Sequence, residues 1–107
     1  MNKQAFEVVK QLATARGLKI NGSQFDAPTF GSWWVELAGS PPLRVVWDGK
    51  DRWLIVARKT ARVFSGLPVW EDLWVGREER EQSPEQALEH VCQSFGKSLE
   101  RSSQRGA

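Results

Sequence analysis

The sequence predicts an α+β domain in which one antiparallel sheet of four strands carries two helices packed on one face. Three observations support this prediction: helical periodicity near each end of the chain, four short alternating segments between them, and turn residues that separate those segments. Strands joined by short turns pair with their chain neighbours, and flanking helices cover one side of such a sheet. The expected order is α-β-β-β-β-α, in a single domain over residues 1–96.

The first helix is expected over residues 3–16. Its apolar residues recur at spacings of three and four, as on one face of a helix: Ala5, Val8, Val9, Leu12 and Ala13. Gly17 suits the end of this helix because glycine adopts the left-handed conformation without steric cost. Residues 17–31 show no sustained periodicity and contain the turn signal Asn21-Gly22, so we expect a loop there.

Four strands are expected next. They cover residues 32–38, 43–47, 52–59 and 69–75. Asp48-Gly49 separates the second strand from the third and predicts a hairpin with a two-residue turn of type I′. Residues 60–68 contain Gly66 and Pro68, and we expect them to connect the last two strands without regular structure.

The chain contains six tryptophans, and all of them fall within the predicted strands. Alternation places Trp33, Trp47 and Trp53 on the faces that we expect to be buried. Adjacent residues of a regular strand point to opposite faces, so Trp34 must lie away from Trp33 and from the main core. The remaining tryptophans either form an exposed contact surface or close a second small core beneath the 17–31 or 60–68 segment: Trp34, Trp70 and Trp74.

The second helix has the clearest start signal in the chain. Ser83 is the expected N-cap, Pro84 takes the first helical position, and Gln86 completes a capping box with Ser83. An apolar face follows, made of Ala87, Leu88, Val91, Cys92 and Phe95. We expect the helix to end at Gly96 and the polar residues 97–107 to be disordered.

No motif with a catalytic mechanism occurs in the sequence. The one histidine, His90, and the one cysteine, Cys92, point about 200° apart on an ideal helix and so do not form a dyad. Glu71 and Asp72 are adjacent on a strand and point to opposite faces, so they do not form a carboxylate pair. A single histidine and a single cysteine also argue against a transition-metal site. We therefore predict a protein without enzymatic activity, metal or cofactor.

The net charge of +2 is too small to indicate a partner, but the charges are segregated along the chain. Residues 44–62 hold six basic and two acidic residues, whereas residues 71–89 hold seven acidic and two basic ones. These segments either neutralise each other across the fold or create one basic and one acidic face.

The first functional hypothesis is a small binding protein of the bacterial immunity or antitoxin type, which occludes the surface of a partner protein. Tryptophan is enriched at interface hot spots, and acidic side chains beside it would suit the basic site of a nuclease toxin. The predicted contact residues are Trp34, Trp70, Glu71, Asp72 and Trp74. An exposed strand edge or tryptophan face is also compatible with a homodimer.

The alternative hypothesis is a nucleic-acid-binding domain that uses the basic, aromatic hairpin of residues 44–62, because such a hairpin suits stacking on single-stranded bases. Its predicted contact residues are Arg44, Arg52, Arg58, Lys59 and Arg62. The helix–sheet–helix order resembles that of double-stranded RNA-binding domains. In those domains a lysine-rich helix start faces the phosphates, whereas this second helix begins Ser83-Pro84-Glu85-Gln86. A third hypothesis is a carboxylate enzyme or a small-ligand pocket between sheet and helices.

The cellular location is expected to be the cytoplasm of a bacterium, with no membrane partner. No segment approaches the roughly 20 apolar residues of a membrane span. The first residues also lack the continuous apolar stretch of a signal peptide, since Glu7, Lys10 and Gln11 interrupt it.

Overall fold

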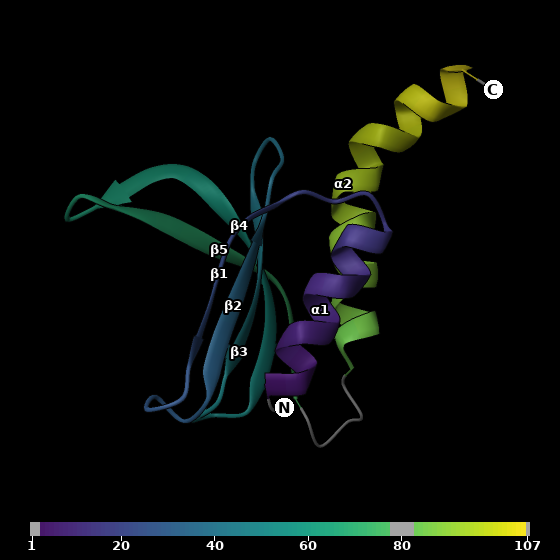
Figure 1. The fold of residues 1–107 in the computed structure, drawn as a ribbon. Helices are drawn as coiled ribbons and strands as arrows, with labels where there is room; N and C mark the ends of the chain where they lie inside the picture. Colours follow the sequence, from purple (N-terminus) through teal and green to yellow (C-terminus); the bar gives the residue numbers. More distant parts are fainter. Residues whose placement is uncertain (1–2, 78–82, 107) are drawn as a thin grey trace.

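The computed structural model describes residues 3–77 and 83–106 (Figure 1). Two helices and five strands follow one another in this order: α1 (Lys3–Ala15), β1 (Ile20–Asp26), β2 (Ser32–Leu37), β3 (Leu43–Asp48), β4 (Trp53–Phe64), β5 (Leu67–Arg77) and α2 (Pro84–Gly106). The predicted α+β class with one antiparallel sheet and two helices is confirmed, but the sheet has five strands where four were predicted. None of the helices in the described ranges is long and apolar enough to cross a membrane.

The five strands form a meander, in which each strand pairs antiparallel with its neighbour in the chain. Both helices pack against the same face of this sheet, and they also contact each other (Figure 1). No helix of the described chain covers the opposite face, which we call the open face. The fold therefore has two layers, and one side of the sheet is available for contacts.

The hydrophobic core lies between the helices and the covered face of the sheet. From α1 it receives Phe6, Val9 and Ala13, and from α2 it receives Ala87, Leu88 and Val91. The sheet contributes Trp33, Val35, Leu37, Leu43, Val45, Trp47, Leu54 and Val56. All of these side chains are at most 5% exposed, so this layer is the main source of hydrophobic stabilisation.

The prediction that Trp53 is buried is wrong. Trp47 pairs with Leu54, so Leu54 and Val56 face the core, while Trp53 lies half-buried on the other face. The sequence from Trp53 to Ala57 is apolar at every position. Alternation therefore cannot distinguish the two faces of this strand, and the pairing with β3 sets them.

The predicted hairpin between β3 and β4 is present, but its turn is not the two-residue type I′ turn. Asp48 pairs with Trp53, which leaves a loop of residues 49–52, and Arg52 adopts a positive φ of 60°. The carboxylate of Asp48 accepts hydrogen bonds from the backbone N–H groups of Lys50 and Asp51, at 3.0 and 3.2 Å. These bonds favour the longer loop by satisfying its backbone.

The additional strand β1 lies in the segment that was predicted to be a loop. Its pairing with β2 runs from Ile20 opposite Leu37 to Asp26 opposite Ser32, with an irregularity between Ile20 and Gly22. The strand lies at the edge of the sheet, and its sequence lacks the alternation that would have marked it. Backbone pairing with β2 overrides its low strand propensity.

The start of α2 agrees with the prediction. Ser83 Oγ accepts a hydrogen bond from the backbone N–H of Gln86, and Gln86 Oε1 accepts one from the N–H of Ser83, both at 3.2 Å. This reciprocal pair is a capping box. The expected end at Gly96 is wrong, because the helical backbone continues to Gly106.

Candidate functional site

The centre of the open face is apolar. One row of paired residues crosses β2, β3, β4 and β5 on this face: Trp34, Val46, Ile55 and Val75. The first three are half-buried, and Val75 is 44% exposed. A contiguous apolar patch on an uncovered face is a mark of a contact surface.

A polar row lies beside the apolar one on the same face. In this row Glu36 pairs with Arg44, Arg44 pairs with Ala57, and Ala57 pairs with Asp72. Nε of Arg44 donates a hydrogen bond to Oε1 of Glu36 at 3.1 Å. The apolar centre is thus flanked by charged groups, as in protein interfaces with an apolar core and a polar rim.

The guanidinium of Arg44 lies between two indole rings. Its central carbon is 4.3 Å from the ring centroid of Trp34 and 4.3 Å from that of Trp70. Trp70 belongs to β5, so the side chain of Arg44 on β3 reaches across Ala57 of β4. Ala57 is only 4% exposed on this uncovered face, because larger side chains cover it. The two cation–π contacts and the Glu36 bond hold the arginine in one position.

Residues 59–70 form a two-stranded arm that bends away from the helices (Figure 1). Its turn is Ser65-Gly66, with φ of 53° and 80°, and Phe64 pairs with Leu67 across it. Positive φ at both central residues is the requirement of a type I′ hairpin. The prediction that residues 60–68 lack regular structure is therefore wrong.

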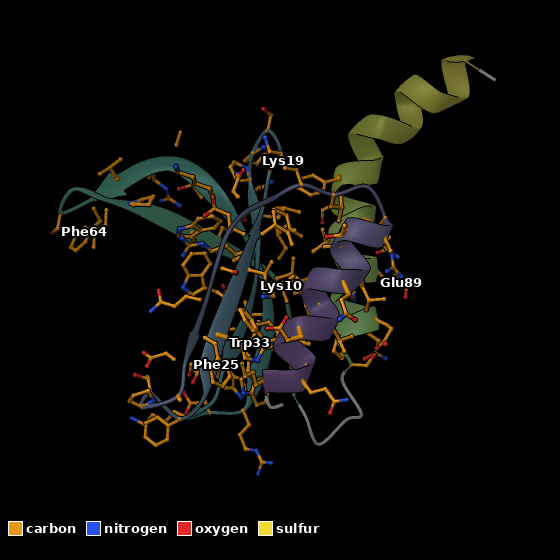
Figure 2. All side chains as sticks on the ribbon, viewed as in Figure 1. Lys10, Lys19, Phe25, Trp33, Phe64 and Glu89 are labelled. Carbon is orange, nitrogen blue, oxygen red and sulfur yellow. The ribbon has the colours of Figure 1, made fainter. Side chains whose placement is uncertain are left out.

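The tip of the arm carries three bulky apolar side chains exposed to solvent: Val63 at 68%, Phe64 at 76% and Leu67 at 68%. Figure 2 shows Phe64 at the free end of the arm, far from Trp33 in the core. These side chains contribute nothing to the core, so folding alone does not account for them.

The arm leaves the plane of the sheet at an irregularity in β4. The register shifts between Lys59 and Val63. The hydroxyl of Thr60 donates a hydrogen bond to the carbonyl of Val69 at 2.8 Å and accepts one from the N–H of Arg62 at 3.2 Å. These bonds satisfy backbone groups at the irregularity, and extra residues in one strand bend a hairpin.

The structure separates the residues that were predicted to contact a partner protein. The open face holds Trp34, Trp70 and Asp72, whereas Glu71 and Trp74 lie on the face covered by helices. The cause is a bulge: Val56 pairs with Trp74 but Ala57 pairs with Asp72, which leaves Leu73 as an extra residue in β5. Strict alternation would have placed Trp70 and Trp74 on the same face of the sheet. The bulge turns Trp74 to the covered face, while Trp70 stays on the open face.

Trp74 has a structural role on the covered face. It packs against the core, and its ring stacks on that of His90 of α2, with centroids 4.6 Å apart and an interplanar angle of 20°. This contact attaches β5 to the second helix. The histidine ring is therefore part of the sheet–helix packing.

Glu71 on the covered face is paired with Arg58. Nη2 of Arg58 donates to Oε2 of Glu71 at 2.8 Å, and both side chains are about half exposed. This hydrogen bond, followed by the positive charge of Arg58, lowers the pKa of Glu71 from its ordinary value of 4.5.

The basic residues predicted to contact nucleic acid do not form one patch. Arg44 lies on the open face between the tryptophans, and Arg58 lies on the covered face. Lys59 and Arg62 belong to the arm, and Arg52 belongs to the β3–β4 loop at the other end of β4. The arrangement distributes the basic segment over both faces and both ends of the sheet.

Within residues 3–77 and 83–106, no group of three histidine, cysteine, aspartate or glutamate side chains could hold a metal ion. Cys92 is a free, half-buried residue of α2. The groupings that stand out are the open face with its Arg44 contact and the arm.

Sequence reasoning missed part of this surface. Val46, Ile55 and Val75 were not among the predicted contact residues, because an apolar strand residue is assigned to the core unless the pairing is known. The exposed Phe64 and Leu67 were missed because the turn signal Ser65-Gly66 was not used to define a hairpin.

No family model, curated protein or solved structure matches the chain.

Proposed function

We propose that this chain is a non-enzymatic binding domain that holds a partner protein against the open face and the arm. The observation that carries the proposal is the contact of Arg44 with Trp34 and Trp70. Tryptophan and arginine are the residue types most enriched at interface hot spots, and here they are pre-ordered on an uncovered face. Ordering before binding reduces the entropic cost of association.

The arm supports the same proposal. Its tip exposes Val63, Phe64 and Leu67 on a hairpin with a defined turn. Covering exposed apolar side chains with a partner is favourable, because it removes apolar surface from water. The arm also leaves the sheet at an angle, so that a partner would be contacted by two surfaces (Figure 1).

In its narrower form, the proposal is a cytoplasmic bacterial protein of the immunity or antitoxin type that occludes a toxin. The acidic groups on the open face, Glu36 and Asp72, support this form, because carboxylates can occupy a basic site that normally receives phosphate. Glu71 and Trp74 are no longer part of the proposed contact set, since they lie on the covered face. The contact set becomes Trp34, Arg44, Trp70, Asp72 and Val75.

Affinity purification with the full chain tests the proposal. The variants Trp70→Ala and Val75→Asp change the open face at half-buried or exposed positions, and Gln93→Lys changes an exposed position of α2 as the matched control. We expect the control to retain the partner captured by the wild type, and the open-face variants to lose it while still unfolding cooperatively. Trp70→Ala should melt below the wild type because it loses the contact with Arg44. Retention of that partner by both folded open-face variants would reject the proposal.

Nucleic acid is the second candidate partner, and one observation favours it. The arm contains Lys59 and Arg62 and no acidic residue, and it carries the aromatic Phe64 and Trp70. A gel shift at about 50 mM salt is the sensitive test, because phosphate contacts are strongest at low salt. Retardation that is lost in a Lys59→Gln, Arg62→Gln variant would favour nucleic acid, and absence of retardation would reject it.

A second copy of the chain is the remaining candidate. β1 and β5 each have one neighbour in the sheet, which leaves backbone groups of both edges available for pairing. Sedimentation of the purified chain separates this case from a different protein partner, since a homodimer forms without any added component.

A further inference from the structure

A cleft lies on the covered side of the sheet, beyond the part that the helices fill. Its volume is about 690 Å³. Four elements line it: the α1–β1 connection, the β2–β3 connection, the covered face of the sheet, and α2. The lining residues used below are Leu18, Lys19, Leu43, Arg58, Leu73 and Phe95.

The walls of the cleft are largely apolar. Leu43 is 2% exposed, and Leu73, the bulge residue of β5, is 37% exposed. The ring of Phe95 lies so close to Gly39 that a Cβ on the glycine would collide with it. Gly39 therefore allows the aromatic ring to approach the β2–β3 connection and close one side of the cleft.

The charged groups of the cleft are both basic. Lys19 and Arg58 line it, and no acidic side chain of the described residues does. Figure 2 shows Lys19 at the upper end of the sheet. The guanidinium of Arg58 is positioned by Glu71 through Nη2. Because a guanidinium has five N–H donors, an anion can share it with that carboxylate.

We infer that this cleft binds a small amphipathic anion, composed of an aromatic or short alkyl body and one carboxylate or sulfonate group. Its volume falls within the roughly 300–1,000 Å³ of small-molecule sites, which combine apolar walls with a few polar groups. The apolar body fits between Leu18, Leu73 and Phe95. Glu71 offsets one of the two positive charges, so the site suits a single negative charge. The inference does not depend on the proposed partner, because the cleft lies on the other side of the sheet.

The test uses anilinonaphthalene sulfonate, a fluorescent probe with an apolar body and one anionic group. The full chain is titrated by fluorescence and by amide NMR. Gly17 and Gly39 report on the cleft, whereas Gly22 lies against Trp34 on the open face and Gly66 is at the arm turn. We expect saturable binding with one probe per chain, with shifts at Gly17 and Gly39 but not at Gly22 or Gly66.

Two variants examine the two features of the site separately. Ser94→Trp fills the cleft from α2, and Arg58→Gln removes a positive charge from a side chain that is 43% exposed. Each is expected to weaken probe binding by about tenfold, the effect of losing roughly one good contact. The control Lys50→Gln removes a positive charge from an exposed position of the β3–β4 loop, outside the cleft, and should leave binding unchanged. Absence of saturable binding, shifts confined to Gly22 or Gly66, or wild-type affinity in a folded Arg58→Gln variant would overturn the inference.

Discussion

The guanidinium of Arg44 on β3 lies 4.3 Å from the ring centroid of Trp70 on β5, although β4 separates the two strands. The contact is made over Ala57, the smallest side chain of its cross-strand row. It connects the base of the arm to the centre of the open face. An arginine that was predicted to contact nucleic acid is thus joined to a tryptophan that was predicted to contact protein.

The first prediction concerns the energy of this contact. A double-mutant cycle with Arg44→Ala and Trp70→Ala should give a coupling free energy of about 0.5–1 kcal/mol in favour of the pair, as for partly exposed cation–π contacts. The free energies of unfolding are measured in urea. The matched cycle with Arg58→Ala and Trp70→Ala should be additive, because Arg58 lies on the covered face. Additivity in both cycles would show that Arg44 and Trp70 do not interact in solution.

The second prediction concerns the two faces of β4. Leu54 is fully buried and Ile55 is half-buried on the open face. Leu54→Ala should lower the free energy of unfolding by about 2–5 kcal/mol. Ile55→Ala should cost clearly less, because its site is open to solvent and leaves no enclosed cavity. A larger loss of unfolding free energy in Ile55→Ala than in Leu54→Ala would show that the face of β4 with Trp53 and Ile55 lies in the core, as the sequence had predicted for Trp53.

The third prediction concerns the turn of the arm. Gly66 has a φ of +80°, and no atom lies within 4 Å of a Cβ placed on it. The cost of Gly66→Ala is therefore backbone strain alone, about 1–2 kcal/mol. It should appear as faster hydrogen exchange of arm amides, with little change in the exchange of α1. Gly66→Asn should be milder because asparagine tolerates positive φ. Equal exchange rates of the arm amides in Gly66→Ala and the wild type would show that Gly66 does not require a positive φ in this turn.

The fourth prediction concerns pH. The hydrogen bond from Arg58 lowers the pKa of Glu71 from 4.5, so the ionised carboxylate is favoured in the folded state. The stabilisation is present above pH 4.5 and is lost as the pH falls through the lowered folded-state pKa. An NMR titration of the Glu71 carboxyl should show the lowered value in the wild type and a return towards the ordinary value in Arg58→Gln. An unchanged pKa in that variant would show that Arg58 is not the cause.

Much of the fold could be predicted from local sequence. The α1 periodicity and the capping box at Ser83 depend on residues close in the chain, and both are found in the structure. The strand β1 could not be predicted, because its residues pair through the backbone and show no regular alternation. The helix end at Gly96 was also wrong, since one glycine within a helical backbone does not by itself terminate it.

The candidate site was predicted only in part, for a specific reason. Trp34 and Trp70 were expected either on an exposed contact surface or in a second small core, and the structure brings them together through Arg44 on the open face. Alternation along the strand assigned Trp74 to the same face as Trp70. The bulge at Leu73 instead places Trp74 on the covered face. Bulges and pairing registers depend on the neighbouring strand, so alternation within one segment cannot reveal them.

Hydrogen exchange of the chain, free and bound to the partner isolated by affinity purification, tests the central claim most directly. If the partner binds the open face and the arm, exchange should slow in residues 59–75, which include the arm and most of β5. Exchange in α1, which lies on the covered side, should remain unchanged. Slowed exchange confined to α1 and α2, with none in residues 59–75, would contradict the account.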